Sequence, residues 1–159
     1  MTPLTQLVYI SRSAFARPEN FRGGIEPNAE KIILHSRVNN RKSGLTGVLC
    51  FGDGCFLQCL EGEEDLINKL LLKLKEDSRH SDFTVLWQKP IQTRSFGPWE
   101  MKFVAVKGPM MKWLESLGYQ RFDPFQFDGQ MVDRVLNFLG SIETVLNFEG
   151  AVDARDQQG

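Results

Sequence analysis

The chain has 159 residues, a length typical of one domain. A chain of this size can bury roughly 70% of its unfolded surface, so it needs no metal or disulfide for stability. Its 19 Lys and Arg residues against 20 Asp and Glu residues give a net charge of −1. This balance argues against a protein that binds nucleic acid or an anionic membrane by general electrostatics. No apolar run reaches the ~18 residues of a membrane span, and the N-terminus lacks the features of a signal peptide, so a cytoplasmic location is expected.

The first half of the chain predicts strands and helices in alternation. Residues 4–11 have the period of a strand, with Leu7, Tyr9 and Ser11 on one face. After a loop rich in Pro and Gly, a helix is expected from about Pro27 to the stop at Ser43 and Gly44. Residues 45–51 and 55–61 predict two strands joined by the short turn Gly52-Asp53-Gly54, as in a hairpin.

The second half continues the same alternation. An acidic start and a stripe of Leu and Ile predict a helix from about residue 63 to residue 77. Residues 83–88 predict a strand closed by Pro90, and residues 99–106 predict another, with Trp99, Met101 and Phe103 on one face. Glu100 and Lys102 are then expected to face away.

The order β-α-β-β-α-β-β favours a ferredoxin-like α+β fold, with two helices on one face of a mostly antiparallel sheet. Residues 109–148 predict two further helices around a loop that contains Phe122, Phe125 and Phe127. These helices can cover the other face of the sheet. We therefore expect one unit over residues 1–107, a helical extension over residues 108–149, and a disordered tail over residues 150–159.

Gln58 is the least expected residue of the predicted sheet, because it lies in the apolar run from Cys55 to Leu60. A buried amide that is left unpaired costs roughly 1–3 kcal/mol, so Gln58 should have a polar partner. Tyr9 and the pair Trp99 and Met101 lie on other predicted strands and are the candidates. Polar groups among aromatic side chains indicate either a planar ligand or a hydrogen-bond network in the core.

The three cysteines Cys50, Cys55 and Cys59 carry no clear signal of their own. They are odd in number, and their spacings match no zinc pattern. All three lie in predicted strands, where a free thiol packs as a small apolar group. We expect reduced core thiols and no metal site.

Five separate segments, taken together, resemble one family. They are Tyr9 on the first strand, Asn39-Asn40 followed by Ser-Gly-Leu-Thr-Gly-Val-Leu (residues 43–49), Phe-Leu-Gln-Cys-Leu-Glu-Gly (residues 56–62), Asp-Ser-Arg-His (residues 77–80) and Trp-Glu-Met (residues 99–101). In this order and spacing they resemble the BLUF family of flavin-binding blue-light sensors, from Leu4 to about Val106. The C-terminal helices resemble those of the short, PixD-like members, which carry no fused output domain. One departure is the stretch from Arg12 to Pro27, which is longer than in those members and is expected to form a surface loop.

The resemblance implies that FAD or FMN binds non-covalently between the first two helices. It assigns Tyr9 as the donor of an electron and then a proton, and Gln58 as the amide that rearranges between Tyr9 and the flavin. Trp99 and Met101 would face the pocket and sense that rearrangement. The remaining residues would bind the cofactor: Asn40, Asn39 and Ser36 near the ring, and Lys73, Arg79 and His80 near the phosphate.

The resemblance also implies a sensor without enzymatic activity of its own, which signals by association in a homo-oligomer or with a separate downstream protein. No membrane and no direct nucleic-acid contact are expected. Three alternatives fit less well. An RNA-binding module of the same fold would have a basic surface and its own aromatic motif. A LOV-type photoreceptor would have an Arg after the reactive Cys, which is missing between Cys55 and Gln58, and a flavin redox enzyme would show a Gly-rich dinucleotide fingerprint.

Overall fold

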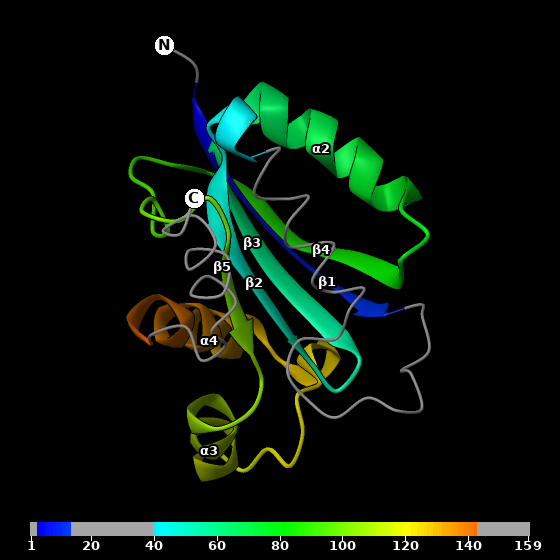
Figure 1. The fold of residues 1–159 in the computed structure, drawn as a ribbon, viewed down its shortest axis with the longest axis vertical. Coiled ribbons are helices and arrows are strands. Elements are labelled where there is room, and N and C mark those ends of the chain that lie inside the picture. The colour runs from blue at the N-terminus through cyan, green and yellow to red at the C-terminus, as the bar shows by residue number, and fades with distance from the viewer. Residues whose placement is uncertain (1–2, 14–39, 143–159) are drawn as a thin grey trace, which may run out of the picture.

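A computed structural model describes residues 3–13 and 40–142 of the chain. These residues contain a five-stranded sheet in the order β4-β1-β3-β2-β5 (Figure 1). The strands are β1 (Leu4–Ser13), β2 (Thr46–Gly52), β3 (Cys55–Glu63), β4 (His80–Ile91) and β5 (Lys102–Ala105). The helices are α2 (Glu64–Glu76), α3 (Pro109–Ser116) and α4 (Gly129–Ser141), with a 3-10 turn η1 (Pro124–Gln126) before α4.

The sheet is mostly antiparallel, as predicted. Strand β1 pairs antiparallel with both β3 and β4, β2 pairs antiparallel with β3, and only β5 runs parallel to its partner β2. The hairpin between β2 and β3 turns at Asp53 and Gly54, whose φ angles are 47° and 77°. Positive φ at both central residues matches the twist of the flanking strands, and Gly54 adopts it without strain.

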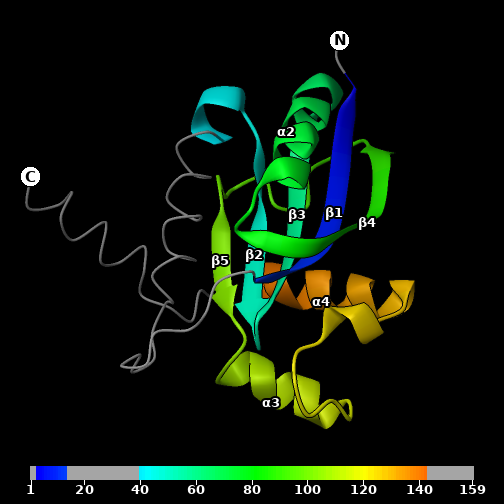
Figure 2. The same cartoon turned by 90° about the vertical axis from the view of Figure 1, so that its right-hand side faces the viewer.

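The two faces of the sheet carry separate apolar clusters. Figures 1 and 2 show helix α2 on one side of the sheet and helix α4 on the other. On one face, helix α2 buries Ile67 against a cluster of side chains from the sheet: Leu7, Tyr9, Leu49, Phe56, Leu60, Met101 and Phe103. The acidic residues Glu64 and Asp65 in the first turn of α2 favour a helix start there through the macrodipole.

Helices α3 and α4 cover the other face. Their buried residues, among them Met110, Leu114, Val132, Val135 and Leu139, pack on inward-facing strand residues such as Val8, Ile10, Leu57 and Val104. Asp128 caps α4 by accepting a hydrogen bond from the backbone N–H of Met131 at 2.8 Å. The ferredoxin-like α+β class and the placement of the C-terminal helices are therefore confirmed.

The bounds of β4 and β5 differ clearly from the prediction. Strand β4 runs from His80 to Ile91 and includes Pro90, which was predicted to end it. Pro90 is tolerated because β4 is an edge strand of the described sheet, so the missing N–H removes no pairing on its open side. Strand β5 begins at Lys102 and not at Trp99. The structure describes only the last turn of the first predicted helix, at residues 40–43. This turn ends at Gly44, in agreement with the prediction.

Candidate functional site

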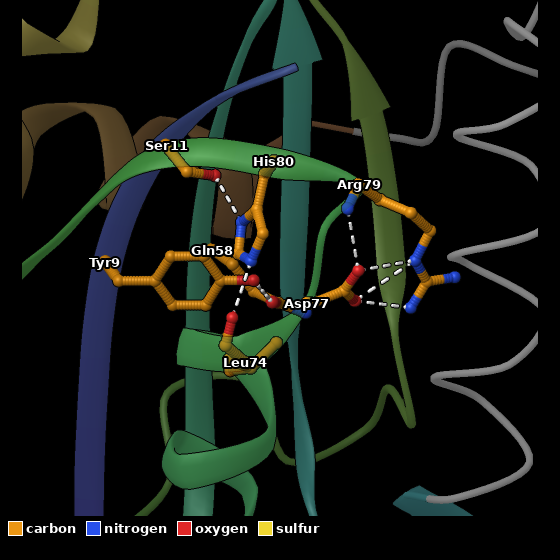
Figure 3. A network of polar contacts seen from close by, with 7 residues as sticks. All are labelled: Tyr9, Ser11, Gln58, Leu74, Asp77, Arg79 and His80. Carbon is orange, nitrogen blue, oxygen red and sulfur yellow. Dashed lines mark hydrogen bonds and ion pairs between the residues drawn. The ribbon is translucent and has the colours of Figure 1, made fainter. Parts of the chain in front are cut away.

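Tyr9 and Gln58 face each other across the centre of the sheet. They are opposed in the register of β1 and β3, and the Tyr9 hydroxyl donates a hydrogen bond to Gln58 Oε1 (Figure 3). Because that oxygen accepts from Tyr9, the amide nitrogen of Gln58 points the other way and donates to Met101 Sδ at 3.4 Å. Two strand residues and Met101, which directly precedes β5, thus form one line of contacts on the α2 face.

Tyr9 lies in apolar surroundings that keep its hydroxyl neutral. Its ring packs on Phe83 with 4.6 Å between ring centroids. Burial raises the pKa of Tyr9 well above its ordinary value, and the carboxylate of Asp77 raises this pKa further, while Arg79 opposes the shift. The hydroxyl therefore keeps its proton through the physiological pH range and is a hydrogen-bond donor in the resting protein.

His80 connects the end of α2 to β1 beside Tyr9. Its Nε2 lies 2.7 Å from the carbonyl oxygen of Leu74, which can only accept, so Nε2 carries the proton of that bond. Its Nδ1 lies 2.9 Å from Ser11 Oγ. Both ring nitrogens are thus engaged within the protein, and the ring stands edge-on to Tyr9 at 6.1 Å (Figure 3).

Arg79 forms an ion pair with Asp77 at the same end of α2. The closest contact, Arg79 Nη2 to Asp77 Oδ2, is 2.6 Å, and Arg79 Nε also bonds the carboxylate. These hydrogen bonds lower the pKa of Asp77 and raise that of Arg79. The guanidinium keeps part of its surface exposed, and so does Lys73 one turn before the end of α2.

Asn40 is placed by the helical turn that precedes β2. Its side-chain Nδ2 donates a hydrogen bond to the backbone carbonyl oxygen of Glu100 at 2.6 Å. The backbone carbonyl of Asn40 accepts a hydrogen bond from the backbone N–H of Leu45, which closes the helix end after Gly44 (φ 71°). Asn40 is only 2% exposed. Ser36 and Asn39, also predicted to bind the cofactor, lie outside the described residues.

The prediction that Trp99 shares a face with Met101 is wrong. Trp99 packs against the cluster on the α4 face, 6.3 Å from Phe96 between ring centroids, whereas Met101 belongs to the cluster on the α2 face. The chain turns at Trp99, whose N–H bonds the carbonyl of Phe96, so strand alternation does not extend back from β5. Lys102, which was expected to face away from Trp99, has its ammonium 4.2 Å from the Trp99 ring centroid. Of the two candidates, Met101 is the one that contacts Gln58.

One buried polar cluster, around Glu61, was not predicted from the sequence. Glu61 is fully buried, and its carboxylate accepts hydrogen bonds from Gln6 Nε2 and from the backbone N–H groups of Ser95 and Phe96 at 2.8–3.0 Å. Trp87 Nε1 donates to Gln6 Oε1 at 2.9 Å and so fixes the orientation of that amide. A charged residue inside an apolar strand was the available signal, just as an uncharged polar amide inside the same strand was the signal for Gln58.

The buried amides of Gln58 and Asn40 fit the polar edge of a flavin ring. Gln58 is 4% exposed, and the only acceptor that the described residues offer its amide nitrogen is a thioether sulfur, a weak one. The described chain likewise offers no donor to Asn40 Oδ1. A heterocycle with ring nitrogens and carbonyl groups supplies both kinds of partner, so the residues present fit the cofactor.

The comparisons with known proteins agree with this reading. Residues 4–102 match the family model of BLUF domains, described as sensors of blue light using FAD. The chain belongs to the BLUF family, and the flavin is that family's cofactor.

Several relatives and solved structures are similar to this chain. The photoactivated adenylate cyclase subunit beta of Euglena gracilis is 33% identical over 95 residues, which is 60% of this chain and 10% of that protein. The photoactivated adenylate cyclase subunit beta-like protein FB of the same organism is 30% identical over 110 residues, which is 69% of this chain and 12% of that protein. This chain therefore spans about a tenth of these curated relatives.

Among solved structures, the photo-activated state of BlsA has a TM-score of 0.78 at 28% identity, over 89% of this chain and 98% of that one. The dark state of BlrB, a BLUF protein, has a TM-score of 0.69 at 26% identity over the same shares. These similarities extend beyond residue 102 and include the C-terminal helices. None of the helices in the described ranges is long and apolar enough to span a membrane.

Proposed function

We propose that this chain senses blue light with bound FAD or FMN, that Tyr9 and Gln58 are its photoactive pair, and that Met101 is the first residue to respond. The observation that carries the proposal is the line of contacts from the Tyr9 hydroxyl through the Gln58 amide to the Met101 sulfur. A bound flavin supplies absorption of blue light and, once excited, the capacity to accept an electron. All other steps belong to residues of this chain.

Tyr9 is suited to give up an electron and then a proton. The phenol is neutral at rest, and loss of an electron from the ring makes its hydroxyl strongly acidic. Gln58 Oε1 lies at the acceptor position of that hydroxyl, so the first acceptor of the proton is already in place. The apolar surroundings of Tyr9 favour the neutral form and keep water from competing for the proton.

Gln58 is suited to carry the change onward, because an amide both donates and accepts hydrogen bonds. When Tyr9 no longer donates, the reason for the present orientation of the amide is gone. Rotation or tautomerisation of the Gln58 amide then changes the group that faces Met101. The hydrogen bond from Gln58 Nε2 to Met101 Sδ is therefore lost or replaced. With flavin bound, a donor that Gln58 turns toward the ring would shift the absorption slightly to the red.

The cofactor would be held by the groups around this line. Asn40, Asn39 and Ser36 are proposed for the ring, and Arg79 and Lys73, both partly or largely exposed at the end of α2, for the phosphate. His80 was predicted near the phosphate as well. Since Leu74 and Ser11 engage both of its ring nitrogens, we propose that it contributes through its ring, beside Tyr9.

The output is proposed to be a change in association, with a second copy or with a separate downstream protein in the cytoplasm. Residues 1–107 would form the sensor unit and residues 108–149 the helical extension that reports its state. We assign no enzymatic reaction to this chain, since the cyclase names belong to relatives of which the matched segment covers only 10%. Size-exclusion chromatography with light scattering, in darkness and under blue light, measures this output.

The assignment of Tyr9 is tested by Tyr9→Phe, which keeps the ring and removes the hydroxyl. The expected result is a protein that binds flavin, fluoresces for longer and gives no stable red-shifted state. Tyr119→Phe is the matched control, because Tyr119 is the second of the two tyrosines and packs near Phe127 in the C-terminal layer. A normal photocycle in Tyr9→Phe would refute the assignment of this residue.

A further inference from the structure

Lys102 is a buried cation between the sheet and the C-terminal layer. It is 3% exposed, although it lies on β5, which is an edge strand of the described sheet. Its ammonium lies over the Trp99 ring, 4.2 Å from the centroid, and donates a hydrogen bond to the carbonyl oxygen of Ile142, the C-cap residue of α4. The side chain thus joins β5 to the end of a helix 40 residues further along the chain.

These partners are the kinds that can hold a desolvated ammonium. A buried charge is costly unless it is paired and hydrogen-bonded. The C-terminus of a helix carries partial negative charge and unpaired carbonyl groups, and the face of a Trp ring attracts a cation. The position of the end of α4 is therefore tied to the position of the Lys102 side chain.

Lys102 also directly follows Met101, the residue that contacts Gln58. Met101 belongs to the cluster on the α2 face, whereas the Lys102 ammonium lies with Trp99 on the α4 face. Strand β5 pairs only with β2 in the described sheet, through Val48↔Lys102 and the three following residue pairs. A shift of the backbone at Met101 therefore also shifts the backbone of Lys102, from which the ammonium extends. In the described sheet, only the pairing with β2 opposes this shift.

We propose that Lys102 couples the photoactive face to the end of α4. In the dark state its ammonium fixes the last turn of α4, and the displacement of Met101 after a Gln58 rearrangement weakens that contact and loosens the turn. Lys102 acts here as a positioning residue. The inference rests on the proposed light-sensing function for its trigger, whereas the contact with α4 is independent of light.

The test is amide hydrogen exchange in the full chain with its flavin, measured for the last turn of α4 (residues 138–142) and for α2. Lys102→Met keeps the length and apolar stem of the side chain and removes the charge. Lys107→Met is the matched control, since Lys107 is exposed and lies five residues on. In darkness, exchange in the last turn of α4 is expected to rise about tenfold in Lys102→Met, as for the loss of one charge-assisted hydrogen bond, and to stay unchanged in Lys107→Met.

Illumination tests the coupling itself. In the wild type, light is expected to speed exchange in the last turn of α4. Lys102→Met should keep the red shift of the flavin but show no further light-dependent change at this turn. A full light-dependent change in Lys102→Met, or no light effect on α4 in a wild type that shows the red shift, would overturn the proposal.

The failure of the proposed function would look different. A wild type without any red shift would refute the light-sensing function. Amide exchange in the last turn of α4, compared between Lys102→Met and Lys107→Met in darkness, would still decide whether the contact of Lys102 with α4 exists. If Lys102→Met does not fold, Trp99→Leu removes the ring above the ammonium and keeps the charge. It should give a smaller rise in exchange at the same turn, and wild-type exchange there would count against the proposal.

Discussion

The bond between Tyr9 and Gln58 can be tested by its effect on stability as well as by spectroscopy. Gln58→Leu leaves the buried Tyr9 hydroxyl without its acceptor, and Tyr9→Phe leaves Gln58 Oε1 without its donor. Each single change strands a buried polar group and is expected to lower the free energy of unfolding by about 1–3 kcal/mol. The double variant replaces both partners by apolar groups of similar shape, which is close to neutral for such a pair.

We therefore expect the double variant Tyr9→Phe/Gln58→Leu to be less destabilised than the sum of the single variants, with a coupling of about 2–3 kcal/mol. The assay is urea unfolding of the flavin-free and flavin-bound protein, followed by circular dichroism. The coupling should be largest in the flavin-free protein, where Gln58 has no ligand partner. Strictly additive losses in the flavin-free protein would show that this bond does not form there, and the geometry proposed for the photoactive pair would be refuted.

Three further predictions concern residues around the pair. Asn40→Ala should weaken flavin retention about five- to a hundredfold, the equivalent of one stranded hydrogen bond, and more than Asn39→Ala; equal flavin content in both would contradict the assignment. Glu61→Gln should lower the free energy of unfolding by about 1–3 kcal/mol, whereas Glu63→Gln, an exposed change on the same strand, should be neutral; equal losses would rule out the buried network. The hydrogen bonds from Arg79 lower the pKa of Asp77, so the ion pair stabilises the fold above the ordinary pKa of ~3.9 and loses this effect as the pH falls through the lowered value. The difference in the free energy of unfolding between wild type and Asp77→Asn should therefore shrink in acid. A difference that stays constant with pH would speak against the ion pair.

The central part of the site could be predicted because it depends on strand alternation within long, regular strands. The period of two places Tyr9 on the same face as Leu7, and Gln58 on the same face as Phe56 and Leu60. A polar side chain on each of two facing strands then requires a partner. The contact between Tyr9 and Gln58 follows from these two facts once the strands pair antiparallel.

The same rule failed at Trp99 because it was applied outside a strand. The turn between Phe96 and Trp99 and the start of β5 at Lys102 depend on contacts that lie far apart in the sequence, such as the bond from Gly47 N–H to the Trp99 carbonyl. For the same reason, nothing in the local sequence shows that Glu61 accepts from a loop more than 30 residues away. Pro90 was a local signal for a strand end, and the edge position of β4 removed its effect.

The light-minus-dark absorption difference spectrum of the flavin-bound protein tests the central claim most directly. We expect blue light to produce a small, reversible red shift of the flavin band in the wild type, which returns in darkness. Gln58→Leu should bind flavin and lose that shift, whereas Gln88→Leu, a change of an exposed glutamine bonded to Asn68, should keep it. A normal shift in Gln58→Leu, or a wild type that binds flavin without any shift, would contradict the account.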